Sequence, residues 1–107
     1  MNKYRNRREG GFDSRKERER YSQLQLMEYA GQIHGLRRQV RFELVPVQHR
    51  PGKSALRGVS YVADFTYYRD GQLIVEDVKS PATAREPAYI IKKKLMYWRY
   101  KIDIQEI

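Results

Sequence analysis

The sequence contains no cysteine and only two histidines. Without cysteine, the chain can form neither a disulfide framework nor a thiolate metal site. The histidines, His34 and His49, are far apart in the sequence and have no ligand partners nearby, so we assign neither to a metal. Candidate metal ligands are therefore carboxylates and other oxygen donors.

No apolar run is long enough for a signal peptide or a membrane span. We therefore expect a cytoplasmic protein without a membrane partner. The length of 107 residues predicts one domain, and 40% hydrophobic residues suffice for a single core. The net charge of +9 suggests a polyanionic partner such as a nucleic acid, although a soluble basic protein without such a partner has the same composition.

Residues 1–13 combine basic side chains with adjacent glycines and lack apolar periodicity. We expect a flexible basic arm that either lies along a phosphate backbone or has no role. The domain itself is expected at residues 14–107 and begins with a helix over residues 14–30. Ser14 is a suitable N-cap for this helix, and Glu17 three residues later fits the pattern of a capping box.

A first strand is predicted at residues 40–45, followed by a long basic loop over residues 46–58. A second helix is expected from about Ala84, with a run of three lysines on its exposed side. The last strand is predicted at residues 100–104. The apolar face of the second helix is expected to comprise Ile90, Ile91, Leu95 and Trp98.

Residues 60–69 and 72–79 predict a β-hairpin, because both segments alternate apolar and polar side chains. Asp70 and Gly71 separate the two segments. An Asp-Gly pair between two such segments is a strong signal for a two-residue turn, since both residues tolerate positive φ. The position of this turn also predicts which residues of the two strands lie opposite each other.

Counting back from that turn places Asp64 opposite Asp77. Lys79 joins Asp77 on one face, because side chains alternate along a strand. Two facing carboxylates repel each other, and a divalent cation between them reverses that repulsion. The hairpin therefore predicts a metal-dependent site for phosphodiester chemistry.

These features resemble the PD-(D/E)XK nuclease superfamily, whose core order α-β-β-β-α-β matches the order that we predict. The resemblance implies an α/β (α+β) fold with a restriction-endonuclease-like core and a mixed sheet flanked by helices. Within the superfamily, the chain most resembles a small phage and prophage family of the DUF1064 type. The residue before Asp64 is alanine rather than proline, a departure that the superfamily tolerates. The matching residues are Ser14 and Glu17, Ala63-Asp64-Phe65, Glu76-Asp77-Val78-Lys79, Lys92 to Lys94, and the pair Arg38-Gln39.

The resemblance implies that Asp64 and Asp77 bind Mg²⁺ or Mn²⁺, with the carbonyl of Val78 as a third ligand. Hard oxygen ligands of this kind hold Mg²⁺, which polarises a phosphoryl oxygen and lowers the pKa of bound water. Lys79 would orient or activate the attacking water and stabilise negative charge on the phosphate.

Two further residues gain a role from the resemblance. Glu17 would complete the site, as a ligand through water or as a partner of Lys79, although the spacing alone favours the capping box. Gln39 would support the scissile phosphate. The residues expected to contact DNA are Arg5, Arg7, Arg8, Arg15, Arg38, Arg50, Lys53, Arg57, Lys92, Lys93 and Lys94.

The leading hypothesis is a metal-dependent DNA endonuclease of phage replication or recombination, acting in the cytoplasm of a bacterial host. So small a domain has little surface for base-specific readout, so we expect selectivity for branched DNA such as a Holliday junction, with duplex as the other candidate. Two coordinated cuts would require a homodimer, whereas nicking by a monomer stays open. The alternative is a non-catalytic nucleic-acid-binding accessory protein on the same fold, and RNA is not excluded as a substrate.

Overall fold

The computed structural model describes residues 11–12 and 14–107. Most of the predicted basic arm, including Arg5, Arg7 and Arg8, therefore lies outside the described residues. The elements along the chain are α1 (Arg15–Tyr29), β1 (His34–Val45), β2 (Gln48–Arg50), β3 (Lys53–Leu56), β4 (Val59–Arg69), β5 (Gln72–Asp77), α2 (Pro81–Ala84), α3 (Pro87–Tyr100) and β6 (Gln105–Glu106).

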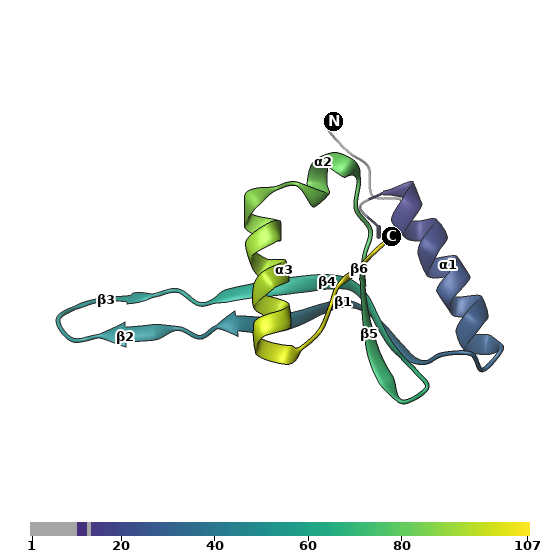
Figure 1. Ribbon diagram of the computed structural model, residues 1–107, viewed down its shortest axis with the longest axis horizontal. Helices are drawn as coiled ribbons and strands as arrows, with labels where there is room; N and C mark the ends of the chain where they lie inside the picture. Colours follow the sequence, from purple (N-terminus) through teal and green to yellow (C-terminus); the bar gives the residue numbers. More distant parts are fainter. Residues whose placement is uncertain (1–10, 13) are drawn as a thin grey trace.

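Four strands form one mixed sheet in the order β1-β4-β5-β6 (Figure 1). The pairs β1–β4 and β4–β5 are antiparallel, whereas β5 and β6 are parallel. Strands β2 and β3 form a separate two-stranded sheet. Together with α1 and α3, the strands of the main sheet follow the order α-β-β-β-α-β, which confirms the predicted mixed α+β class.

The predicted turn between β4 and β5 is confirmed. Asp70 and Gly71 have φ angles of 52° and 77°, as a two-residue hairpin turn with positive φ at both positions requires. Arg69 consequently pairs with Gln72, and the pairing continues in step to Phe65 and Glu76. The next residues along the two strands are Asp64 and Asp77, so the turn sets which carboxylates meet.

Helix α1 begins at its predicted cap, where the side chain of Ser14 accepts a hydrogen bond from the backbone N–H of Glu17 (3.1 Å). Its buried residue Leu24 packs with Phe65 and Tyr67, which belong to the C-terminal half of β4. Phe12, from the segment predicted as a flexible arm, is buried in the same cluster. These contacts hold α1, which carries Glu17 in its first turn, against the sheet.

Helix α3 packs on another part of the sheet, but through a different face from the predicted one. Tyr89 and Met96, seven residues and two turns apart, are its buried side chains. Of the predicted apolar face, Leu95 is partly buried against the core, whereas Ile91 and Trp98 are 57% and 68% exposed. The prediction was wrong because the helix carries apolar residues on several faces, so periodicity alone does not identify the buried one.

Several predicted boundaries also need correction, including that of the second hairpin strand, β5, which ends at Asp77 rather than at residue 79. Strand β1 begins at His34 rather than at residue 40. The predicted loop over residues 46–58 contains strands β2 and β3. Tyr100 ends helix α3 instead of starting a strand, because Lys101 adopts a left-handed conformation (φ 60°) that stops the helix and delays the last strand to Gln105–Glu106. The second helix is likewise split into α2 and α3 and does not start at Ala84.

Within residues 11–12 and 14–107, no helix is both long enough and apolar enough to cross a membrane.

Candidate active site

The candidate site lies where strands β4 and β5 separate. Beyond the pair of Phe65 and Glu76, the β4–β5 ladder has no further pairs. At this point the backbone N–H of Val78 donates to Oδ2 of Asp64 (2.8 Å), so a side chain replaces the next ladder contact. The end of the ladder thus holds the Asp64 carboxylate beside Asp77.

The two carboxyl groups share an environment that disfavours two negative charges. Burial, and next the neighbouring carboxyl group of Asp77, raise the pKa of Asp64 from its ordinary value of 3.8 to about 7. The hydrogen bonds from the N–H of Val78 and the amide of Gln39 oppose that rise without cancelling it. A positive charge placed between the carboxylates would relieve this cost.

Asp77 is 5% exposed, and two side chains besides Asp64 contact its carboxylate. The hydroxyl of Tyr61 donates to Oδ2 of Asp77 (2.7 Å), and Nζ of Lys79 lies 3.4 Å from the same oxygen. Burial, followed by the charge of Asp77, raises the pKa of Tyr61, so its hydroxyl stays protonated and keeps donating. These contacts hold one oxygen of Asp77 in place.

Lys79 is fixed at both its backbone and its side chain. Its N–H donates to the carbonyl of Ile107 (3.2 Å), and its own carbonyl accepts from Nζ of Lys16 (3.0 Å). Its Nζ lies 4.1 Å from the centre of the Tyr89 ring, within the range of a cation–π interaction. The ammonium group is therefore positioned beside Asp77 before any ligand binds.

Gln39 links Glu17 to Asp64. Its Nε2 atom donates to Oε2 of Glu17 (3.2 Å) and to Oδ1 of Asp64 (3.3 Å). Gln39 has φ of 51°, a conformation that costs a non-glycine residue roughly 1–3 kcal/mol and that occurs preferentially at functional sites. Glu17, which is 3% exposed, thus combines its place next to the helix cap with a carboxylate directed to this site.

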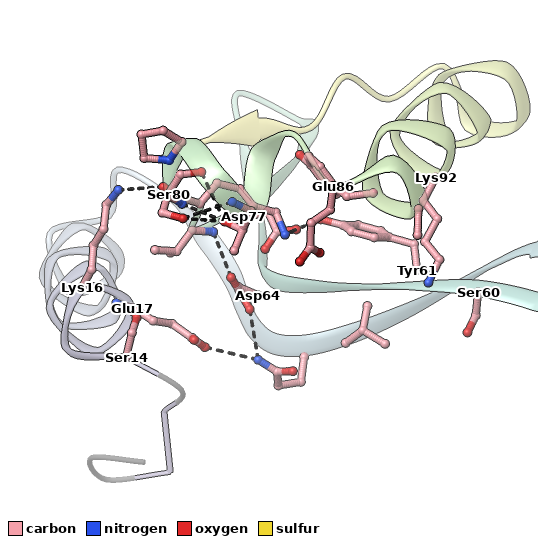
Figure 2. Close-up of a pocket in the computed structure, with 18 residues that line it drawn as sticks. Ser14, Lys16, Glu17, Ser60, Tyr61, Asp64, Asp77, Ser80, Glu86 and Lys92 are labelled. Carbon is pink, nitrogen blue, oxygen red and sulfur yellow. Dashed lines mark hydrogen bonds and ion pairs between the residues drawn. The ribbon is translucent and has the colours of Figure 1, made fainter. Parts of the chain in front are cut away.

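These side chains line an open cleft of about 870 Å³. In Figure 2, Asp64 and Asp77 lie between the first turns of α1, which carries Lys16 and Glu17, and the side of α3 that carries Lys92. Lys16, Lys79 and Lys92 line the cleft together with the acidic side chains of Glu17, Asp64, Asp77 and Glu86. Such a cleft can accept a phosphate at its lysines and a metal at its aspartates.

The neighbouring residue Glu76 lies on the other side of strand β5 and is only 1% exposed. Nε and Nη2 of Arg20 contact its two carboxylate oxygens at 2.9 and 2.6 Å, and the hydroxyl of Tyr67 donates to it as well. Glu76 is therefore a structural link between α1 and β5 and does not contribute to the cleft.

Among the described residues, those predicted to contact DNA come from several elements of the fold. Arg38 stacks on the ring of Phe12 (3.7 Å from its centroid) and donates to the carbonyl of Gly11. Lys93 forms an ion pair with Glu106 (2.7 Å). Lys92 lines the cleft, whereas Arg15 and Lys94 are exposed on α1 and α3, and Arg50, Lys53 and Arg57 lie on or beside the β2–β3 hairpin.

Asp64 and Asp77 are the two predicted metal ligands that lie side by side where β4 and β5 separate. Within the described part of the chain, no three His, Asp or Glu side chains are grouped closely enough to hold a metal ion. Gln39 donates to both Glu17 and Asp64 and so connects the predicted ligand Glu17 to the aspartates. Val78, whose carbonyl was predicted as a third ligand, lines the cleft beside the aspartates. All four predicted ligands, Asp64, Asp77, Val78 and Glu17, thus line this cleft.

The sequence of the chain matches one family model, described as "Protein of unknown function (DUF1064)", over residues 1–106. The chain belongs to the DUF1064 family. No curated protein and no solved structure matches it. The predicted resemblance to the DUF1064 family is thus confirmed, and the site described above is a feature of a DUF1064 protein.

Sequence reasoning missed three residues at the site of this DUF1064 protein. Tyr61 occurs in the alternating pattern of a strand and Tyr89 among the apolar residues of a helix. Their sequence context therefore predicts core positions and no role at the site. Lys16 lies next to Glu17 in the first turn of α1, where a lysine carries no signal of its own. Lys16 reaches the cleft because α1 packs close to the backbone of Lys79, which is a tertiary contact.

Proposed function

We propose that this DUF1064 protein is a metal-dependent DNA endonuclease with a core of the PD-(D/E)XK type. The observation that carries the proposal is the cluster of Asp64, Asp77 and Lys79 at the point where β4 and β5 separate, at the base of an open cleft. Two buried carboxylates beside a fixed lysine lower the stability of the folded protein, and such arrangements are typical of catalytic sites.

The donor set fits a hard divalent cation, Mg²⁺ or Mn²⁺. Two carboxylates and a main-chain carbonyl leave room for water and phosphate oxygens, and Mg²⁺ is usually held in this way. The raised pKa of Asp64 also supports a cation, since its positive charge would favour the ionised form of both aspartates. When bound, the metal would polarise a phosphoryl oxygen and lower the pKa of a bound water.

The chain's own cations would serve the phosphate. Lys79 stands beside Asp77, where its ammonium group would orient the attacking water and stabilise the charge that builds up on the phosphate oxygens. Lys16 and Lys92 line the two sides of the cleft and would hold the flanking phosphates. Gln39 would lose its bonds to Glu17 and Asp64, or share them, in order to donate to the scissile phosphate.

Branched DNA, such as a Holliday junction in phage replication or recombination, is the proposed substrate. The cleft is open, and its lining includes three lysines that could contact phosphates, beside acidic, aromatic and apolar side chains. Recognition of backbone shape therefore suits this cleft better than recognition of sequence. Paired cuts at a junction would need two copies of the chain.

The test is cleavage of labelled four-way junction, flap, duplex and single-stranded DNA with Mg²⁺, with Mn²⁺ and with EDTA. The wild type is compared with Asp77→Asn and with Asp70→Asn, the same substitution in the exposed turn of the same hairpin. We expect metal-dependent cutting by the wild type and the Asp70 variant, and DNA binding without cutting by the Asp77 variant. Cutting by the Asp77 variant at the wild-type rate would refute the proposal.

Within the described residues, no group of three carboxylate or histidine side chains is close enough to hold a metal, which also fits a second function, a nucleic-acid-binding accessory protein without catalysis. Such a protein would bind DNA in a salt-sensitive manner and release no product with any divalent metal. The same assays separate the two functions. For each substrate, the accessory protein would bind with the same affinity with and without EDTA and would never release product.

A further inference from the structure

Strands β2 and β3, with the residues that join them to β1 and β4, form an exposed ribbon over residues 46–58. The two strands pair only with each other, Gln48 with Leu56 and Arg50 with Lys53. Every residue of the ribbon is exposed. Figure 1 shows the ribbon extending away from α1 and α3, so it contributes little to the core.

The charge of the ribbon has one sign. No aspartate or glutamate occurs between Glu43 and Asp64, whereas Arg50, Lys53 and Arg57 are all positive. Among the ion pairs of the described residues, none includes Lys53 or Arg57. Cations without acidic partners attract phosphate and repel a second copy of a chain whose net charge is +9.

The ribbon is preformed despite its exposure. Nε and Nη2 of Arg50 both donate to the carbonyl of Ser54, at 3.2 and 2.9 Å, and so tie one strand to the other. Gly52 takes the positive φ (69°) that the tip requires. A lone two-stranded hairpin is only marginally stable in water, so a ligand that covers the ribbon would stabilise it.

We propose that the ribbon binds a groove of duplex DNA on one side of the cleft, an inference that rests on the proposed nuclease function. The major groove of B-DNA, about 12 Å wide, admits a two-stranded ribbon. Twelve residues separate Gly52 at the tip from Asp64. At about 3.3 Å per residue the tip therefore lies up to roughly 40 Å from the site, about one turn of duplex.

The experiment measures binding to random-sequence duplexes of about ten and about thirty base pairs, in EDTA and at several salt concentrations. The ribbon variant is Lys53→Gln/Arg57→Gln. The matched control is Arg69→Gln/Lys101→Gln, which removes two exposed cations beside a separate cavity at the far end of β4. Circular dichroism and thermal unfolding establish that both variants are folded.

We expect the ribbon variant to bind the long duplex more weakly, with the slope of log Kd against log salt reduced by about two. On the short duplex, which cannot span the cleft and the ribbon, its affinity should fall much less. The control should match the wild type in both respects. Equal losses in the two variants, or equal losses on the two duplexes, would overturn the proposal.

A change of oligomeric state in the ribbon variant alone, measured by analytical ultracentrifugation, would also overturn it and would assign the ribbon to a second copy. The outcome is independent of catalysis because EDTA is present throughout. Loss of long-duplex binding by the ribbon variant, with no cutting by the wild type, would refute only the nuclease. Metal-dependent cutting with no effect of the ribbon variant would refute only the ribbon.

Discussion

Replacing Asp64 with asparagine should stabilise the metal-free protein at about pH 8 and change it little near pH 4. The pKa of Asp64 is about 7 in the folded chain and near 3.8 in the unfolded chain. Between these values the folded state binds more protons than the unfolded state, so the free energy of unfolding falls as the pH rises through this range. Above about pH 7 the full cost of the charge is present.

The magnitude follows from the size of the shift. A rise of about three units corresponds to about 4 kcal/mol at 1.36 kcal/mol per unit. Asp64 is only half-buried, and solvent screens part of the repulsion, so we expect a gain of about 2 kcal/mol. Asparagine keeps a carbonyl oxygen that can accept from the N–H of Val78, so the substitution removes the charge without removing that bond.

The assay is urea unfolding of the wild type and of Asp64→Asn, each near pH 4 and near pH 8, with EDTA present. Asp70→Asn is the control, because it removes an exposed carboxylate from the turn of the same hairpin. Adding Mg²⁺ at the higher pH should stabilise the wild type and have less effect on the Asp64 variant. The reasoning would be refuted if Asp64→Asn lowered the free energy of unfolding near pH 8, or changed it by the same amount near pH 4 and near pH 8.

Two further substitutions test the support of the site. Arg20→Met leaves the buried Glu76 without its cation and should lower the free energy of unfolding, measured in urea, by about 3 kcal/mol. The control Arg99→Met breaks an exposed ion pair and should lower it by no more than about 1 kcal/mol. Equal losses in the two variants would contradict this prediction. Tyr61→Phe removes the donor to Asp77 and should slow metal-dependent cleavage by about tenfold while the chain stays folded. An unchanged rate would show that the hydroxyl does not position the carboxylate.

The sequence predicts the hairpin that carries the site because its turn is chemically distinctive. Asp70 and Gly71 accept the positive φ that a two-residue turn needs, and the register of every residue up to Phe65 follows from it. The neighbouring positions of Asp64 and Asp77 are a consequence of that register. Local signals of this kind depend on a few residues and not on tertiary packing.

The parts of the fold that sequence reasoning missed lack such a signal. The ribbon over residues 46–58 is exposed on both faces, so it shows no alternation of apolar and polar side chains. Helix α3 ends at Tyr100, and the next residue, Lys101, takes the left-handed conformation for which a glycine is the usual signal. Its buried face became clear only from the contacts of Tyr89 and Met96 with the sheet.

The supporting residues of the site depend on contacts between distant segments. Gln39 reaches Glu17 and Asp64 from a strand position with positive φ, which sequence does not reveal. Tyr61 is sixteen residues from Asp77, and its hydroxyl is visible as a hydrogen-bond donor to Asp77 only once both strands are placed. The sequence therefore indicated Asp64, Asp77, Lys79, Glu17 and Gln39, and the structure adds their neighbours Tyr61, Tyr89 and Lys16.

The most direct test of the central claim is the ratio of cleavage rates between Asp70→Asn and Asp77→Asn on the best DNA substrate with Mg²⁺. Both variants lose one carboxylate from the same hairpin, so they differ in whether the lost group faces Lys79 in the cleft. A metal-dependent nuclease with Asp77 as a ligand predicts a ratio of roughly a hundred or more. A ratio near one, or cutting that persists in EDTA, would contradict it.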